Sequence, residues 1–168
     1  LHESHRSWDG KLQLQVAVLL DPGSGPSLSN LATVWIALGD PRAYPVAKRS
    51  CIALPNDLTT YINRAAARLH DGDVQGAASE FEELARTVPL IAELHDRLAG
   101  ALEALTWYSE ALVWRKRFLC LTPESVTGYR KIASTLVMGG YGEQARKTSR
   151  RVFFVHPSPV SRFLSILR

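Results

Sequence analysis

Few residues of this 168-residue chain have the types and spacing that catalysis or metal binding requires. His2, Glu3 and His5 lie close together near the N-terminus, but no further metal-ligand motif accompanies them. Two histidines three residues apart are weak evidence for zinc, which takes four ligands in structural sites. Because terminal segments are commonly solvated and poorly ordered, we expect no metal site there.

Glycines and cysteines offer no stronger candidate. Gly139 and Gly140 lack the spacing of a phosphate-binding loop and stand between two helical segments, so we expect a turn. Cys51 and Cys120 are the chain's two cysteines, and we expect both to be buried and unreactive, as free cysteines commonly are. The sequence therefore predicts no enzyme, no cofactor and no metal site.

The composition is that of an ordinary globular protein. There are 20 basic and 16 acidic side chains, and 46% of the residues are apolar, which argues against a disordered or fibrous chain. Uninterrupted apolar stretches such as residues 16–20 are too short to cross a bilayer, so we expect no transmembrane segment. The chain starts at Leu1 without a recognisable leader, so we expect a processed N-terminus and leave the compartment open.

The main signal in the sequence is an internal repeat of 34 residues. Prolines recur at this interval, and an alanine stands twelve residues before each of them. We name these the repeat prolines (Pro55, Pro89, Pro123, Pro157) and the repeat alanines (Ala43, Ala77, Ala111, Ala145). Two series with the same period and a fixed offset indicate one structural unit repeated along the chain.

Each repeat contains two stretches of helical periodicity. Leu28, Leu31 and Trp35 form an apolar stripe in the first half of one repeat, and Ala77, Phe81 and Ala85 form another in the second half of the next. No alternating strand pattern of useful length interrupts these stretches. The sequence therefore predicts an all-α fold made of helical hairpins.

Turn residues mark the ends of the helices. Glycine at Gly39 and Gly72 can end a first helix, because glycine readily adopts a positive φ; Thr106 stands where the third repeat lacks this glycine. A repeat proline ends each second helix because it lacks an amide donor. Pro45 falls early in its helix, so we expect that helix to start late or to bend.

The pattern resembles the tetratricopeptide repeat, a 34-residue helix–turn–helix. Residues 126–159 carry the resemblance most fully, through Tyr129, Ile132, Ala133, Leu136, Gly140, Ala145 and Pro157. The sequence departs from the family pattern at Arg64, Arg68 and Arg115, which replace apolar or aromatic residues. The resemblance implies a right-handed α-solenoid.

The repeat register divides the chain into six segments. Residues 1–23 form a flexible N-terminus plus the second helix of a partial repeat, residues 24–57, 58–91, 92–125 and 126–159 form repeats, and residues 160–168 start a further or capping helix. Phe163, Ile166 and Leu167 favour a further helix over a polar cap. Because both ends divide a repeat, we expect the chain to be an excerpt of a longer protein.

In the resembling family, the first helices line a concave groove that takes an extended or helical peptide. The matching groove candidates here are Asn63, Ala66, His70, Asp96, Gly100, Arg130 and Ser134. Arg130 alone could hold a carboxylate and Asp96 would repel one, which argues against a clamp for a chaperone's C-terminal tail. The small residues either leave room for a partner or serve close helix packing, and the sequence leaves both interpretations open.

Positive charge gathers towards the C-terminus, where residues 126–168 carry eight basic side chains and one acidic side chain. Arg146, Lys147, Arg150 and Arg151 lie on one face of a second helix, which the resemblance places on the convex side. A solvated helix face is the usual explanation of such a run, and without interleaved stacking aromatics the run argues against a nucleic-acid site.

These observations favour a non-catalytic interaction scaffold that binds a peptide, a helix or a partner domain in its groove. A second hypothesis is a regulatory or substrate-presenting arm of a larger enzyme, such as a glycosyltransferase or sulfotransferase, whose catalytic domain lies outside this chain. A third is self-association through open repeat ends.

Overall fold

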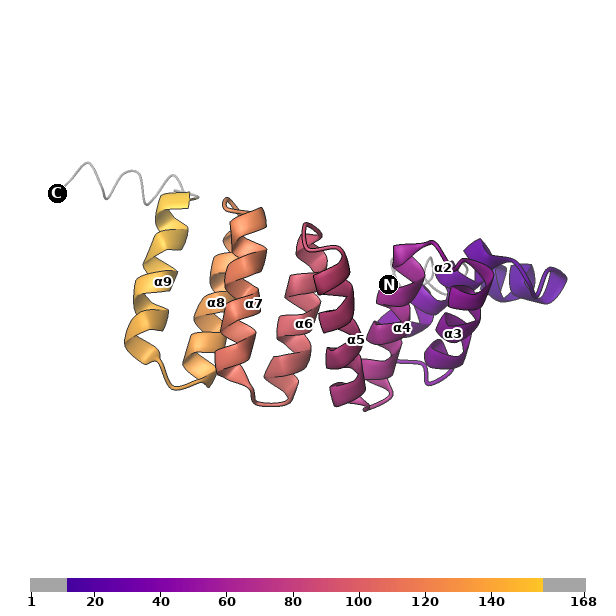
Figure 1. The fold of residues 1–168 in the computed structure, drawn as a ribbon, viewed down its shortest axis with the longest axis horizontal. Helices are drawn as coiled ribbons and strands as arrows, with labels where there is room; N and C mark the ends of the chain where they lie inside the picture. The colour runs from indigo at the N-terminus through magenta and orange to yellow at the C-terminus, as the bar shows by residue number, and fades with distance from the viewer. Residues whose placement is uncertain (1–11, 156–168) are drawn as a thin grey trace, which may run out of the picture. The chain divides into compact units, whose positions relative to one another are not determined.

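A computed structural model describes residues 12–155 and shows only helices and connecting turns in this range (Figure 1). A first helix covers residues 12–20. It is followed by α2 (Gly25–Ala37), α3 (Ala43–Ala53), α4 (Leu58–His70), α5 (Val74–Thr87), α6 (Ala92–Ala104), α7 (Tyr108–Leu121), α8 (Val126–Met138) and α9 (Gly142–Val155). The predicted all-α helical repeat fold is confirmed.

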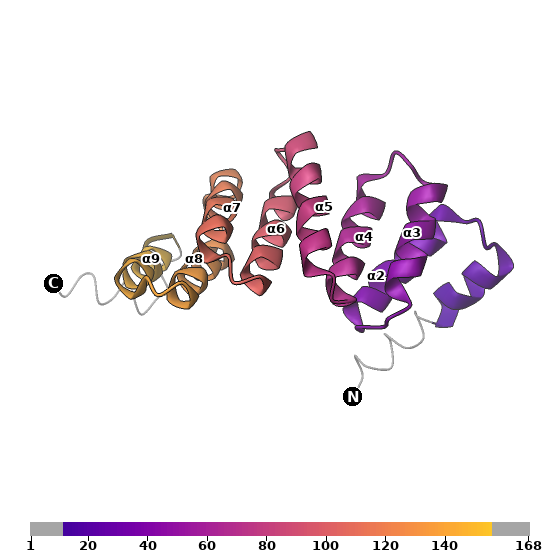
Figure 2. The same cartoon turned by 60° about the horizontal axis from the view of Figure 1, so that its bottom comes forward.

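The chain divides into two compact units, unit 1 over Leu1–Glu80 and unit 2 over Phe81–Arg168. In unit 1, the apolar stripe of α2 packs against α3 and the end of α4. Leu28, Leu31 and Trp35 are at most 6% exposed, and Leu14 and Val18 of the first helix pack against the cluster that contains them. Figure 2 shows α2, α3 and α4 packed as neighbours. Helical periodicity therefore located the core of unit 1 correctly.

Unit 2 holds the C-terminal part of α5 and the antiparallel pairs α6/α7 and α8/α9 (Figure 2). Leu94 and Leu98 on α6 are almost fully buried, as are Ile132 and Leu136 on α8. The repeat alanines of both units are between 0% and 4% exposed. At these positions the helices pack so closely that a small side chain is needed, which explains why alanine recurs.

Helix ends follow the predicted turn residues. The helices α3, α5 and α7 each stop two residues before a repeat proline. The helix α3 begins at the repeat alanine Ala43 itself, whereas α5 and α7 begin three residues before theirs, so the late start is confirmed. Pro45 then lies in the first turn of α3, where its missing amide has no helical partner to lose.

Three of the turns between paired helices use a glycine of positive φ, and the third repeat uses threonine instead. Gly39, Gly72 and Gly140 have φ values of 65°, 92° and 83°. Thr106 occupies the corresponding position with φ 62°. A β-branched residue in this region is strained, so the turn geometry is imposed by the helices on either side.

Some predictions fall on residues outside the described range. These are the N-terminal cluster His2, Glu3 and His5, the repeat proline Pro157, and the C-terminal helix signal of Phe163, Ile166 and Leu167. Within residues 12–155, no helix is both long enough and apolar enough to span a membrane. The same residues contain no group of three or more side chains that could together hold a metal ion.

Candidate functional site

A cluster of charged side chains connects α6, α7 and α8 in unit 2. Arg115 of α7 is only 5% exposed and forms ion pairs with Asp96 and Glu103, both on α6. From α8, Lys131 places its Nζ 2.6 Å from Asp96 Oδ2, and the Thr135 hydroxyl donates to Glu103. The buried arginine thus has two carboxylate partners. They compensate its charge, which would otherwise be costly to bury.

This cluster changes the expected role of Asp96. From the sequence, its carboxylate would repel an acidic ligand. In the structure, Asp96 accepts from Arg115 on one oxygen and from Lys131 on the other. Its charge is therefore balanced by two cations, and an acidic ligand nearby would meet little net repulsion.

The remaining groove candidates of unit 2 lie on the exposed surface of α6 and α8. Arg130 and Ser134 are exposed, and Gly100 is partly exposed. A Cβ atom built on Gly100 would have one neighbour within 4 Å, Nη2 of Arg115 at 4.0 Å. By contrast, a Cβ on Gly128 would lie 2.9 Å from the Phe118 ring. Close helix packing therefore requires the glycine at 128 but not the glycine at 100.

The groove candidates of unit 1 lie on α4 and differ in exposure. Asn63 is 7% exposed, and its Nδ2 donates to Thr33 Oγ1 at 2.9 Å, with Ser29 Oγ at 3.4 Å. Ala66 is 5% exposed, while His70 is exposed at the end of the helix. The Asn63 amide is thus engaged in holding α4 against α2.

A second charged cluster holds the α4/α5 hairpin of unit 1. Arg68 bonds to Asp73 at 2.6 Å and to Glu80 at 2.8 Å, and these bonds raise the pKa of Arg68 above its ordinary value. Arg64 also bonds to Glu80, at 3.0 Å. Asp73 accepts from the backbone N–H of Gly76, and this bond, followed by that from Arg68, lowers the pKa of Asp73. The carboxylate therefore caps α5 in its charged form.

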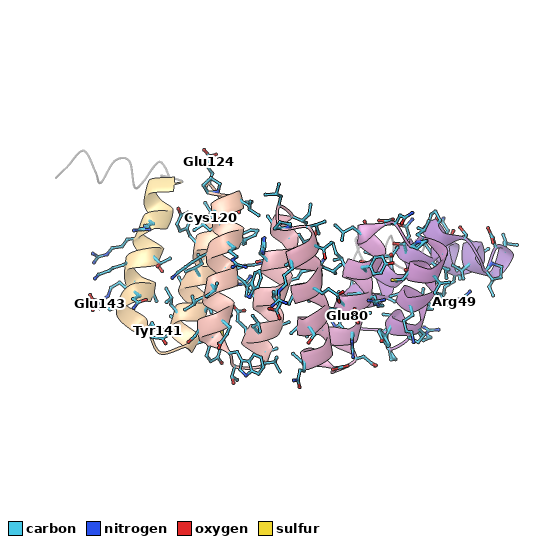
Figure 3. The ribbon with its side chains drawn as sticks, viewed as in Figure 1. Arg49, Glu80, Cys120, Glu124, Tyr141 and Glu143 are labelled. Carbon is cyan, nitrogen blue, oxygen red and sulfur yellow. The ribbon has the colours of Figure 1, made fainter. Side chains whose placement is uncertain are left out.

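The predicted basic surface lies on α9. Arg146, Lys147, Arg150 and Arg151 are all exposed. Lys147 pairs with Glu143 one turn earlier, at 2.9 Å, and both side chains are 72% exposed. Figure 3 shows Glu143 near the start of this helix. An exposed pair of this kind contributes little to stability, and all four basic side chains of this face are open to solvent.

Sequence reasoning missed a pocket of about 410 Å³ on the second helices of unit 2. Its lining comes from the end of α5, the following turn, α6 and α7, and comprises Ala85, Arg86, Pro89, His95, Trp114, Arg117, Cys120 and Leu121. The signal that could have indicated it is the spacing of Trp114, Arg117 and Leu121, which share one face of α7.

The cysteine prediction was right for one residue and wrong for the other. Cys51 is 7% exposed in the core of unit 1. Cys120 is exposed on the last turn of α7, at the pocket, near the C-terminal end of the helix in Figure 3. Helical position decides the difference, because Cys120 does not share the face of α7 that carries the buried Ala111, Leu112 and Arg115.

No protein-family model and no curated protein sequence matches this chain. Solved structures of MamA match its fold. MamA from residue 41 to its end, from Desulfovibrio magneticus RS-1, gives a TM-score of 0.77 at 16% identity over 91% of this chain and 87% of that chain. The MamA RS-1 ArsTM double mutant gives 0.75 at 16% identity over 91% and 86%, and MamA AMB-1 gives 0.73 at 19% over 91% of each chain. MamA is a helical repeat protein of the tetratricopeptide type, and this chain has the same tetratricopeptide-like fold.

Proposed function

We propose that this chain is a non-catalytic scaffold that binds a segment of a protein partner on the exposed face of α6 and α8. The groove of the resembling family lies on the corresponding first helices. The buried polar side chains of this region, Arg115 and Thr135, bond to neighbouring helices. They therefore serve to hold the helices together and leave the partly exposed Gly100 and the exposed Arg130 and Ser134 to meet a partner.

The observation that carries this proposal is the open space at Gly100. Glycine in the middle of a helix costs stability relative to alanine, and no helix packs closely enough against this position to require it. The absence of a side chain at Gly100 leaves room above the Arg115 guanidinium. A bulky side chain of a partner can enter that space.

Charge suggests which partner segments suit this face. Arg130 is exposed and forms no ion pair with any side chain that the structure describes. Lys131 is 39% exposed and pairs with Asp96. A partner that places a large side chain over Gly100 and an acidic group near Arg130 would use the open space and the exposed cation together.

The test compares Gly100→Arg with Gly100→Ala. The tagged chain and both variants are used to capture partners from cells of the source organism, and each purified partner's affinity is then measured by calorimetry. Arginine fills the open space, so we expect Gly100→Arg to lose the partner while circular dichroism shows unchanged helicity. Alanine adds one carbon where nothing is close and should keep the partner.

Equal binding by the arginine variant and the unmodified chain would place the interaction elsewhere. If the partner is a second copy of this chain, the mass measured by light scattering will rise with protein concentration. Gly100→Arg should then abolish that rise when the copies meet on this face.

A further inference from the structure

We propose that the pocket between α5 and α7 is a second binding site, separate from the α6/α8 face, and that it takes an acidic segment of a protein partner. In this assignment a carboxylate of the segment pairs with Arg117, and an apolar side chain packs on Trp114. The pocket volume of about 410 Å³ is within the range of ligand sites and suits one or two side chains.

The charge of the lining favours an anionic occupant. Two lining residues, Arg86 and Arg117, are cationic, and no carboxylate lines the pocket. Arg86 pairs with Glu82 at 2.7 Å through its Nη2 atom. Arg117 forms no ion pair or hydrogen bond with any group in the described part of the chain, and its guanidinium lies 4.3 Å from the Trp114 ring centroid. It is thus a positioned cation with its N–H donors available to a ligand.

The wall of the pocket behind Arg117 is already ordered without a ligand. His95 is 3% exposed and stacks on Trp114 with 5.4 Å between ring centroids and 18° between ring planes. Its Nε2 lies 2.7 Å from the carbonyl oxygen of Pro89, another lining residue. Because His95 holds both Trp114 and the turn at Pro89, little of the wall needs to be ordered when a ligand binds.

One feature favours a peptide segment over a small free anion. Leu121 at the pocket is 37% exposed, and Leu90, next to Pro89 in sequence, is 80% exposed. A peptide that extends beyond the pocket can pack apolar side chains on this surface.

Cys120 provides a direct readout of occupancy. It is exposed and lines the pocket, whereas Cys51, the chain's other cysteine, is buried in unit 1. Alkylation by iodoacetamide, a neutral reagent, therefore reports access to the pocket, and mass spectrometry of the digested chain confirms which thiol reacted.

The experiment uses the full chain and the probe acetyl-Glu-Asp-Phe-Glu-Asp-amide, with acetyl-Gln-Asn-Phe-Gln-Asn-amide as the uncharged control. We expect the acidic peptide to slow alkylation of Cys120 several-fold and the control peptide to leave it unchanged. Arg117→Gln should weaken binding of the acidic peptide by about tenfold or more, because a charge-assisted pair is lost. Lys116→Gln makes the same change of charge at the neighbouring exposed residue, which does not line the pocket, and should shift affinity less than about twofold.

Gly100→Arg should leave this binding intact, which separates the pocket from the α6/α8 face. The proposal is overturned if the acidic peptide does not bind, if it binds without protecting Cys120, or if Arg117→Gln binds it as well as the unmodified chain. It is also overturned if 3-phenylpropionate protects Cys120 as strongly as the peptide, because the pocket would then be a site for small organic anions. Circular dichroism of all three variants verifies that they fold.

Discussion

Arg115 donates to both carboxylate oxygens of Glu103, from Nε to Oε1 at 3.1 Å and from Nη2 to Oε2 at 2.9 Å. The pair joins α7 to α6 at a position where the resembling family uses an aromatic residue. A buried guanidinium satisfied in this way holds the two helices in one register, because the two parallel bonds fix its direction.

Removing this arginine should destabilise the protein strongly. Arg115→Met leaves the Asp96 and Glu103 carboxylates without their shared cation, so we expect the free energy of unfolding to fall by about 3 to 5 kcal/mol. The control is Arg97→Met, which removes an exposed pair with Glu93 and should cost about 0.5 kcal/mol or less. Urea denaturation followed by circular dichroism measures both, and equal losses would contradict the structural role of Arg115.

Replacing Thr106 by glycine should stabilise unit 2. Thr106 has φ 62°, which is strained for a β-branched residue and free of strain for glycine. Glycine also has more conformational entropy in the unfolded chain, which offsets part of this effect. We therefore expect the free energy of unfolding to rise by about 0.5 to 2 kcal/mol. Thr127→Gly, at an exposed position in the first turn of α8, should instead lose about 0.3 kcal/mol. A loss in the Thr106 variant would show that the turn is not strained.

Two helical glycines should respond oppositely to alanine. At Gly100, a Cβ meets one atom, 4.0 Å away, so Gly100→Ala should gain about 0.5 to 1 kcal/mol from helix propensity. At Gly128, the Cβ would lie 2.9 Å from Phe118 and 3.1 Å from Leu119, so Gly128→Ala should lose about 1 kcal/mol or more through overpacking. Thermal unfolding of the two variants ranks them, and a more stable Gly128 variant would contradict the packing described here.

Acid should weaken the start of α5 through Asp73. The N–H of Gly76, and after it Arg68, lowers the pKa of Asp73 below its ordinary value of 3.8. Because the folded pKa is the lower one, this stabilisation is fully present above about pH 4 and is lost as pH falls from there through the folded pKa. We expect Asp73→Asn to reduce the loss of stability between pH 5 and pH 2.

The matched control for this pH dependence is Asp71→Asn, because the exposed Asp71 carboxylate has no side-chain hydrogen bond among the described residues. Its acid response should equal that of the unmodified chain. Denaturation midpoints measured across the pH series provide the comparison. Identical curves for all three proteins would show that Asp73 does not contribute to the loss of stability in acid.

The sequence predicted the parts of the fold that depend on neighbours along the chain. Periodic apolar residues such as Leu28 and Leu31 identified the buried helix faces, and spacing identified the repeat alanines. Local turn chemistry identified the helix ends, including the late start at Pro45. These features repeat because each hairpin buries an apolar face at the same positions of its repeat.

The sequence did not predict the polar contacts between helices or the pocket. Arg115 appeared as a departure from the family pattern, since its partners Asp96 and Glu103 lie 19 and 12 residues away. Asn63 was expected to face the groove, and its bond to Thr33 spans 30 residues. The pocket combines residues from three helices and a turn, and no local pattern reports such a combination.

The bond between Asn63 and Ser29 spans 34 residues, one full repeat. On α6 and α8, the pairs Lys131–Asp96 and Thr135–Glu103 likewise join first helices of successive repeats. The α2/α4 contact therefore uses an amide and hydroxyls, whereas the α6/α8 contact uses charges. Reordering these modules by recombination would separate Asp96 from Lys131 and Asn63 from Ser29, so each first helix carries side chains that match its own neighbour in the chain.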